Sequence, residues 1–358
     1  MSATADAVVI GAGIVGAACA LALSRDGLRV AVVEHATVGG GATAAGMGHI
    51  VVMDDSEAQF ALTRYSRDLW QALLPALPPQ TEVERCGTLW VAADTEEMAA
   101  VHAKAAFYAA RGLRAEVLDA QSLAAAEPHL RQSLAGGLLV PDDSVVYAPC
   151  VARWLLDQSG AEVRLGHGSE ISAGLTVYAT GAAAPAHFPW LPIRPRKGHL
   201  AITDRYPGFV HHQLVELGYL KSAHGSANES VAFNVQPRAT GQVLIGSSRQ
   251  FGATHSGADS AILRAMLRRA CQYMPDLAQL SVIRTWTGIR AATDDKLPVI
   301  GEVPDQPGVW LATGHEGLGI TTSLATGQLV ADMVAGRTPA IDPAPYSPAR
   351  FMREPSHA

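Results

Sequence analysis

The sequence is poor in cysteine and has no excess of positive charge, and each absence excludes a class of function. Its four cysteines, Cys19, Cys86, Cys150 and Cys271, are widely scattered, and none forms a Cys-x-x-Cys pair. Because zinc sites, iron–sulfur clusters and redox disulfides use such pairs, we expect buried free thiols and no metal site. The formal net charge is −6, and no Lys/Arg cluster is interleaved with aromatic residues, so a nucleic-acid partner is not expected.

A membrane span and a signal peptide are not expected either. Ala7 to Ser24 carries no charged residue and approaches the roughly 18 apolar residues that suggest a membrane span. However, three glycines at turn spacing interrupt the run, and Asp6 precedes it where a signal peptide would carry Lys or Arg. We therefore interpret the run as a buried strand and a core-facing helix.

Length and composition favour a two-lobed metabolic protein of the cytoplasm. With 358 residues, of which 48% are hydrophobic, the chain can bury a substantial core. We find no tandem repeat and no low-complexity linker.

The clearest motif is a strand, Val8 to Ile10, that leads into Gly11-x-Gly13-x-x-Gly16. Such a strand turns sharply into a helix whose first N–H groups face a pyrophosphate. Gly11 permits the turn, Gly13 lets the backbone approach phosphate, and Gly16 lets the helix pack on the strand. Glu34 ends the next strand eighteen positions after Gly16 (34 − 16), where a ribose-binding acid favours FAD or NAD over NADP. A tight turn that binds no ligand is the alternative.

Apolar spacing predicts the elements between the motifs. Helices are expected over Ser56–Leu74, Glu97–Arg111, Ala120–Ala126, Cys150–Gln158 and Thr321–Val334. Leu175 to Gly181 resembles the strand that ends beneath the phosphates of a dinucleotide fold. Alternating runs between Pro192 and Leu280 predict an antiparallel sheet. We therefore expect the chain to leave a nucleotide-binding domain, build a sheet-based substrate lobe and return.

Three further segments are rich in small residues or glycine. Gly39 to His49 is too apolar for a flexible linker and suits backbone pressed against a flat ligand. Near the other end, Trp286-Thr287-Gly288-Ile289-Arg290 is followed by Gly314-His315-Glu316-Gly317-Leu318-Gly319. In this order, the motifs resemble the D-amino-acid oxidase, glycine oxidase and sarcosine oxidase superfamily of FAD-dependent oxidoreductases over nearly the whole chain.

Within that superfamily, the flavin-bearing β subunit of D-hydroxyproline dehydrogenases looks most similar. The segments that carry this finer resemblance are Ala44–Asp55, Phe233–Arg238 and Glu316–Gly319. The resemblance implies an α/β fold with a glutathione-reductase-like, parallel-sheet, Rossmann-like FAD domain and an inserted antiparallel-sheet substrate domain. The FAD-binding domain would comprise residues 1–80, 139–190 and 285–345, the substrate-binding domain 81–138 and 191–284, and a C-terminal tail 346–358.

The resemblance also implies an activity. A secondary or cyclic D-amino acid, most specifically cis-4-hydroxy-D-proline, would become an imine as its α-carbon gives hydride to flavin N5 without a metal. Arg290 matches the family's carboxylate-binding arginine, whose guanidinium fork makes two parallel hydrogen bonds to one carboxylate. A salt bridge from Arg290 to Asp294 or Asp295 is the alternative.

Five other polar residues are candidates for the active site. Tyr219 matches a tyrosine that relatives place over the substrate carboxylate, and Asn234 is a further pocket candidate. His49 and His315 lie beside the flavin-facing loops, where each could contact the ring or only hold a loop. Glu316 could steer a substrate ammonium, accept its proton or be a solvated loop acid.

The resemblance implies FAD contacts from several separate segments. Gly317 to Ile320 would direct helix N-terminal N–H groups at the flavin O2 region and stabilise the reduced ring, whereas a glycine-rich helix cap is the alternative. The expected contacts are Gly11, Gly13, Ile14, Val15, Gly16, Glu34, His35, Ala42, Thr43, Ala45, Gly46, Met47, Gly48, Ala179, Thr180, Gly181, Gly288, Arg290, Gly314, His315, Gly317, Leu318, Gly319, Ile320 and Thr321.

Partner subunits are a further implication of the β-subunit resemblance. Compared with single-chain members, few residues separate Gln158 from Leu175, and trimming the adenine-side wall in this way could free a surface for a partner. Since no cysteines are arranged for a cluster, further redox centres would belong to other chains. An electron acceptor could also hold the protein at the periphery of a membrane.

Other functions stay open at this point. A nicotinamide-dependent dehydrogenase would use the same first motif but has no need of the C-terminal glycine-rich loop. A glycine, sarcosine or opine oxidase would share the whole pattern. A non-catalytic flavin-carrying subunit that relays electrons would bind FAD but leave substrate untouched.

Overall fold

A computed structural model of the chain describes residues 5–166, 171, 173–218, 229–255 and 257–352. The chain forms two compact units. Unit 1 comprises Met1–Thr81, Tyr147–Arg196 and Ile289–Ala358, and unit 2 comprises Glu82–Val146 and Lys197–Gly288.

A six-stranded sheet lies at the heart of unit 1. Across the sheet, its strands are β15 (Val299–Glu302), β16 (Val309–Thr313), β9 (Leu175–Tyr178), β1 (Ala7–Ile10), β2 (Val30–Glu34) and β8 (Glu162–Leu165). β1 pairs in parallel with β2 and β9, so that Val9 lies opposite both Val32 and Val177. β8 and β16 continue the parallel arrangement, whereas β15 runs antiparallel to β16.

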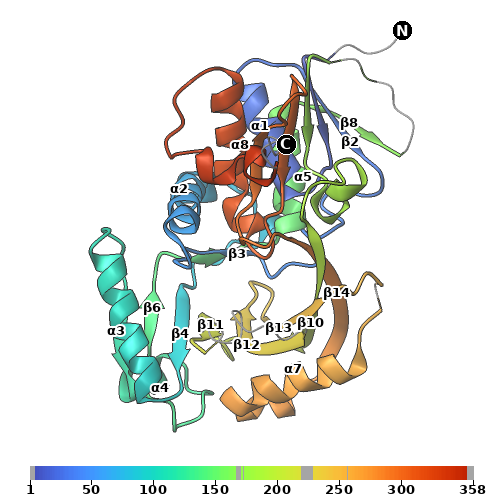
Figure 1. Ribbon diagram of the computed structural model, residues 1–358. Coiled ribbons are helices and arrows are strands. Elements are labelled where there is room, and N and C mark those ends of the chain that lie inside the picture. Colours follow the sequence, from blue (N-terminus) through green and yellow to red (C-terminus); the bar gives the residue numbers. More distant parts are fainter. Residues whose placement is uncertain (1–4, 167–170, 172, 219–228, 256, 353–358) are drawn as a thin grey trace, which may run out of the picture. The chain divides into compact units, whose positions relative to one another are not determined.

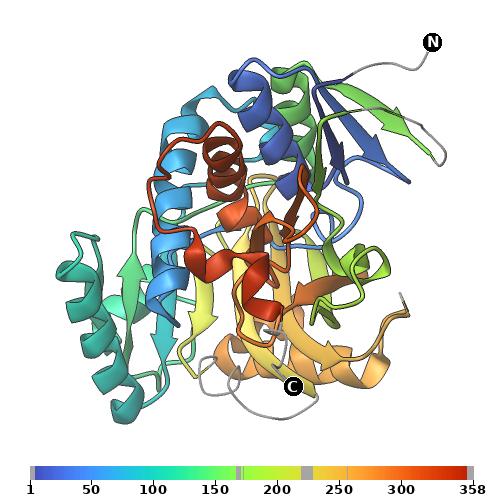
Figure 2. The ribbon, with the colours of Figure 1, turned by 45° about the horizontal axis from the view of Figure 1, so that its top comes forward.

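Helix α1 (Ile14–Arg25) packs against both α5 (Ala148–Ser159) and α8 (Gly319–Val334) in unit 1, as Figures 1 and 2 show. The approach of α8 to α1 is close, because a Cβ at Gly327 would lie 2.5 Å from the carbonyl oxygen of Ala18. α1 is buried along most of its length, which confirms the buried strand and core-facing helix predicted for the uncharged run. Among the helices that the structure describes, none combines the length and apolar character needed to cross a bilayer.

Helix α2 (Glu57–Leu73) also packs against α8. Its start is fixed by Ser56, whose hydroxyl accepts a hydrogen bond from the backbone N–H of Gln59 at 3.1 Å. Pro75 follows its end, as expected for a residue that cannot continue a helix. The helix predicted over Ser56–Leu74 is therefore confirmed. The short strand β3 (His49–Ile50) precedes it in unit 1.

An eight-stranded sheet dominates unit 2. Its strands, in order, are β14 (Val282–Ala292), β10 (Arg194–Arg205), β13 (Gln242–Phe251), β12 (Glu229–Pro237), β11 (Gln213–Glu216), β4 (Thr88–Ala92), β6 (Gly136–Val140) and β5 (Glu116–Asp119). The pairs β11–β12, β12–β13, β4–β6 and β5–β6 are antiparallel, and β11–β4 is parallel. The chain passes between the units within β10 and β14.

The described part of unit 2 also contains three α-helices, one further short strand and the 3-10 helix Pro275–Gln279. The α-helices and the strand are α3 (Thr95–Ala109), α4 (Ala120–Ala126), β7 (Ser144–Val145) and α7 (Ser260–Tyr273). α7 lies along one face of the sheet (Figure 1), and Met266 from α7 joins Leu214 and Phe233 from the sheet in one buried cluster. The predicted α/β fold, with a Rossmann-like parallel sheet and a second, largely antiparallel sheet, is confirmed.

The limits of the two units differ from the predicted domain limits. Residues 139–146 lie in unit 2 because β6 pairs with both β4 and β5. The start of the predicted tail is attached to unit 1, where the Tyr346 hydroxyl donates to the carbonyl of Ala58 at 2.6 Å and Arg350 pairs with Asp295 at 2.7 Å. The ligand-binding roles assigned to these domains stay predictions.

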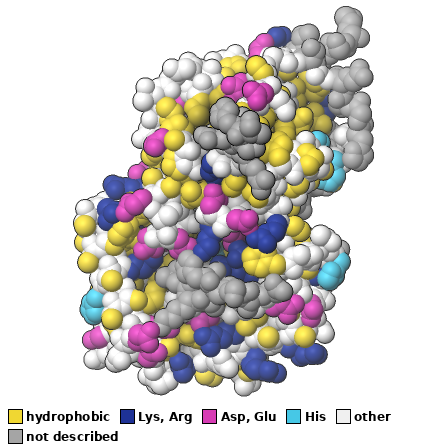
Figure 3. Space-filling view, viewed as in Figure 1, with side chains coloured by type: hydrophobic (Ala, Val, Ile, Leu, Met, Phe, Trp, Pro, Cys, Tyr) yellow, Lys and Arg dark blue, Asp and Glu magenta, His cyan; other side chains and the backbone are white. Residues whose placement is uncertain are grey.

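The four cysteines are free thiols, but only Cys19 is buried, whereas Cys86, Cys150 and Cys271 are half-buried. The expectation of burial was wrong for these three. Within the described ranges, no group of three or more His, Cys, Asp and Glu is arranged to hold a metal ion. On the face in Figure 3, basic and acidic side chains are mixed rather than separated into one basic field.

Candidate functional site

The turn between β1 and α1 leaves no room for a side chain at Gly11 or at Gly16. Gly11 has a φ of 107°, and a Cβ at this position would lie 2.6 Å from the carbonyl oxygen of Ala179. A Cβ at Gly16 would lie 1.9 Å from the carbonyl oxygen of Gly11. The helix therefore begins immediately after a tight turn at the end of the strand. Its first N–H groups lie at the carboxyl end of β1, which is where nucleotide-binding sheets bind phosphate.

Glu34 is fixed beside this turn. Its Oε2 accepts a hydrogen bond from the N–H of Ala12 at 2.9 Å, and its Oε1 accepts one from the N–H of Ala36 at 3.0 Å. His35 Nδ1 lies 2.9 Å from the same Oε1. Since a carboxylate offers about four lone-pair sites, acceptor capacity remains for ribose hydroxyls. The position fits the ribose of a dinucleotide.

Thr43 and Thr180 add polar atoms near the same turn. The hydroxyl of Thr43 accepts a hydrogen bond from the N–H of Ile14, in the first turn of α1, at 3.0 Å. The Thr180 hydroxyl, just after β9, is buried and has no hydrogen-bond partner among the described residues. A buried polar atom of this kind costs free energy unless a ligand or water satisfies it. The arrangement therefore fits a polar cofactor, with Ala179 and Gly181 on either side.

The glycine-rich stretch near Gly46 lies against the start of α8. A Cβ at Gly46 would lie 2.9 Å from Cδ1 of Ile320. Thr321 connects three segments, because its hydroxyl donates to the carbonyl of His49 at 2.8 Å and its carbonyl accepts from Nε1 of Trp70 at 3.0 Å. His49 thus holds α8 through its backbone. Ala42, Ala45, Met47 and Gly48 belong to the same connected region.

The first turn of α8 has no side-chain cap. The loop before it is tight: Gly314 has a φ of 74°, the N–H of Glu316 donates to the carbonyl of Ala291 at 2.8 Å, and the N–H of Leu318 donates to the carbonyl of His315 at 3.0 Å. Gly319, the first residue of α8, follows directly. The helix N-terminus carries partial positive charge, which suits contact with an electron-rich flavin edge.

His315 supports this loop. Burial lowers the pKa of its imidazole to about 3, so the ring is neutral at physiological pH. Its Nε2 lies 3.0 Å from the Thr326 hydroxyl on α8. Of the two roles predicted for His315, these contacts favour the structural one, in which the ring ties the loop to the helix.

Arg290 lies next to the same loop. A Cβ at Gly317 would lie 3.9 Å from both Cδ and Nε of Arg290, so the guanidinium-bearing side chain passes beside the start of α8. The two acids proposed as alternative partners each pair with another arginine, Asp294 with Arg194 and Asp295 with Arg350.

Glu316 forms a buried ion pair with Arg196, whose side chain is only 6% exposed against 15% for Glu316. The interpretation of Glu316 as a solvated loop acid is therefore wrong, because the carboxylate is enclosed and its charge is balanced. Sequence reasoning missed Arg196. Its only signal was the basic start of a strand, Arg194-Pro195-Arg196-Lys197, which does not identify a partner 120 positions later (316 − 196).

The remaining predicted residues fall in three places: outside the described residues, in unit 2, and at the β1–α1 turn. Tyr219 falls outside the described residues. Asn234 is buried on β12 of unit 2, and Gly288 lies on β14 at the limit of unit 2. Gly13 and Val15 belong to the β1–α1 turn.

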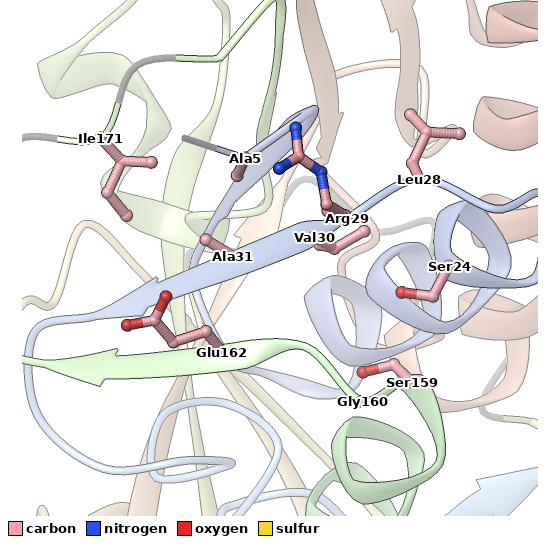
Figure 4. A pocket seen from close by; sticks show the side chains of 10 residues that line it. All are labelled: Ala5, Ser24, Leu28, Arg29, Val30, Ala31, Ser159, Gly160, Glu162 and Ile171. Atoms are coloured by element: carbon pink, nitrogen blue, oxygen red, sulfur yellow. The ribbon is translucent and has the colours of Figure 1, made fainter. Parts of the chain in front are cut away.

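A surface cavity of about 360 Å³ in unit 1 is not the candidate site. Figure 4 shows Arg29, which precedes β2, and Val30 and Ala31 at the start of β2, near Glu162 of β8. These residues lie at the amino ends of the strands, opposite the turn at Gly11, and ligands of such sheets bind at the carboxyl ends. Arg29 is already paired with Asp6 at 2.8 Å.

Comparison with known proteins gives consistent matches over almost the whole chain. The family model described as "FAD dependent oxidoreductase" matches residues 6–333. Glycine oxidase of Pseudomonas aeruginosa is 29% identical, covering 96% of this chain and 98% of that protein. Hydrogen cyanide synthase subunit HcnC of the same species is 27% identical, covering 99% and 98%. The crystal structure of glycine oxidase from Geobacillus kaustophilus superposes with a TM-score of 0.86 at 27% identity, covering 98% and 99%.

Proposed function

Because the chain belongs to the FAD-dependent oxidoreductase family, we propose that it oxidises a secondary or cyclic D-amino acid, most specifically cis-4-hydroxy-D-proline, to the imine. Its cofactor is FAD, and its reaction class is oxidation at the C–N bond of an amino acid. When bound, the flavin accepts at N5 the hydride that leaves the substrate α-carbon. Because the matching family is FAD-dependent, we no longer consider a nicotinamide-dependent dehydrogenase as an alternative. The protein itself must hold the substrate carboxylate, orient the α-carbon and exclude water.

The position of Arg290 carries this proposal. Its side chain passes beside Gly317, at the start of α8, so a carboxylate held by its guanidinium would lie close to the helix N-terminus proposed to contact the flavin. A bidentate guanidinium–carboxylate pair fixes orientation as well as position. We assign Arg290 the role of carboxylate anchor.

Glu316 has a positioning role in this proposal. Arg196 balances its charge within a nearly solvent-free ion pair, so we do not assign it the substrate proton. The pair instead fixes the loop that carries Gly317 and leads into α8. The proton of the substrate ammonium leaves to solvent before or with hydride transfer.

We further propose that the chain works as the catalytic subunit of a hetero-oligomer, with other redox centres on partner chains. The support is the resemblance to a β subunit and the name of one similar protein, a subunit of hydrogen cyanide synthase.

The decisive experiment is an anaerobic screen of the purified protein, following its visible flavin absorbance. The compounds are cis-4-hydroxy-D-proline, D- and L-proline, sarcosine, glycine and an opine. We expect rapid bleaching by cis-4-hydroxy-D-proline. A flavin that this compound leaves oxidised, while another compound bleaches it, would refute the substrate assignment.

A second candidate function is that of a glycine oxidase. It is favoured by the identity to glycine oxidases over nearly the full length of both chains. In the same screen, it predicts bleaching by glycine and rapid reoxidation when air is admitted. A non-catalytic electron-relay subunit predicts that none of the compounds bleaches the flavin.

A further inference from the structure

Two side chains of α2 reach the backbone of α8 in unit 1. The indole N–H of Trp70 donates to the carbonyl of Thr321 at 3.0 Å, and the hydroxyl of Ser66 accepts from the N–H of Ala325 at 3.1 Å. All four residues are buried, and none is more than 1% exposed. The two helices lie side by side (Figures 1 and 2).

The two contacts address one backbone pair of α8. Thr321 and Ala325 are four residues apart, so the carbonyl of the first and the N–H of the second are partners within an α-helix. Ser66 and Trp70 are also four residues apart, which places them on one face of α2. Because a helix already satisfies such a pair, hydrogen bonding within α8 does not require either contact from α2.

These contacts fix α8 both along and around its axis. An indole N–H can only donate, so Trp70 requires a carbonyl at its position, and Ser66 accepts from the N–H one turn further on. A shift of α8 by one residue would remove both partners. The hydroxyl of Thr321 adds a third point of attachment, because it donates to the carbonyl of His49 at 2.8 Å and accepts from the N–H of Val51 at 3.4 Å.

The turn held in this way is the open end of α8. The first intrahelical bond joins the N–H of Thr322 to the carbonyl of Leu318 at 2.8 Å. The N–H groups of Gly319, Ile320 and Thr321 precede this bond and have no partner within the helix. No side chain caps them. They are the N–H groups that would face the flavin, and such a contact weakens steeply when its direction changes.

We propose that Ser66 and Trp70 are positioning residues that raise the reduction potential of the bound flavin through α8. This inference rests on the proposed contact between the N-terminus of α8 and the flavin. Two-electron reduction adds negative charge to the flavin ring, and the N-terminus of a helix stabilises negative charge. By holding the first turn of α8, the two side chains keep its N–H groups directed at that charge.

The test removes one contact at a time. Trp70→Phe keeps an aromatic ring and removes the N–H, and Ser66→Ala removes only the hydroxyl. Tyr346→Phe is the matched control, because the buried Tyr346 hydroxyl donates to the carbonyl of Ala58 at 2.6 Å. It also removes one buried bond between a side chain and a helix backbone, but the partner lies on α2 and not on α8.

The potential of the FAD-loaded protein is measured by anaerobic titration against a reference dye. We expect each α2 variant to lose about fivefold of the preference for reduced over oxidised flavin, which lowers the potential of a two-electron couple by about 20 mV. Tyr346→Phe should lower the urea midpoint of unfolding to a similar extent and leave the potential unchanged. An unchanged potential in both α2 variants, or an equal fall in Tyr346→Phe, overturns the positioning role.

A second measurement separates this role from the flavin contact on which it rests. With FAD isotope-labelled at C2, the infrared stretch of the C2 carbonyl falls in frequency as hydrogen bonds to it strengthen. We expect a lower frequency in wild type than in Ser66→Ala or Trp70→Phe.

A wild-type frequency as high as that of flavin in an aprotic solvent overturns the contact and the positioning role together. A low frequency that both variants retain overturns the positioning role alone. Neither measurement uses substrate, so failure of the substrate assignment leaves both results standing.

Discussion

The β1–α1 turn and the surroundings of Arg290 belong to the same unit, but different physical factors determine their structures. At the turn, space is the limiting quantity: Gly11 and Gly16 face backbone carbonyls at distances that exclude any side chain. In the loop that Arg290 passes, charge is the limiting quantity, because Glu316 of that loop forms a buried ion pair with Arg196. One region is therefore sensitive to added atoms, and the other to removed charges.

The largest effect is expected from adding one methyl group at the turn. Gly11→Ala would place a Cβ 2.6 Å from the Ala179 carbonyl oxygen at a φ of 107°, which a side chain rarely adopts. We expect the Gly11→Ala protein to be purified without flavin. Its flavin content is measured as the ratio of visible to ultraviolet absorbance. Gly174→Ala is the control, because its Cβ would meet nothing within 4 Å. Full flavin content in Gly11→Ala would show that space does not limit this region.

Removing the charge of Arg290 should spare the flavin and impair the substrate. For Arg290→Ala we expect kcat/KM to fall about 10²- to 10³-fold, mainly through KM, because a buried charge pair with the substrate is lost. Arg290→Lys should recover part of the loss, since lysine keeps the charge without the fork. Unchanged kinetics in Arg290→Ala, with flavin bound, would eliminate the carboxylate anchor.

Breaking the Arg196–Glu316 pair should lower the stability of the protein, and removing one partner should cost more than its share of removing both. Removing one partner leaves a buried charge, and we expect Arg196→Met or Glu316→Gln alone to lower the free energy of unfolding by about 3 kcal/mol. The double variant should lose clearly less than the sum of the two, as measured by urea unfolding. Additive losses would mean that the two side chains act independently.

The smallest effect concerns pH. The pKa of His315 is about 3 in the folded protein against about 6.5 for an unperturbed histidine, so the unfolded state binds the proton more readily. Its contribution to stability is complete above pH 6.5 and decreases as the pH falls toward 3. Between pH 7 and pH 5 we expect a loss of about 2 kcal/mol. His315→Gln, which does not titrate, should show a curve shallower by that amount in urea unfolding, and parallel curves would contradict the neutral buried ring.

The local turn could be predicted from the sequence, whereas the long-range ion pair could not. Gly11, Gly13, Gly16 and Glu34 act through a local strand–turn–helix unit, so their spacing identifies the turn. The pairing of Arg196 with Glu316 depends on two segments far apart in the chain, and no spacing rule reports it.

Thr321 has a consequence for the order in which the chain folds during synthesis. Its hydrogen bonds to His49 and Trp70 span 272 and 251 positions, and α8 also packs against α1. Since a ribosome releases the chain from its N-terminus, β1, α1 and α2 must wait for nearly the whole polypeptide before α8 can cover them. Unit 2, which ends at Gly288, is complete earlier. We therefore expect nascent chains that lack α8 to leave the early helices of unit 1 exposed to chaperones.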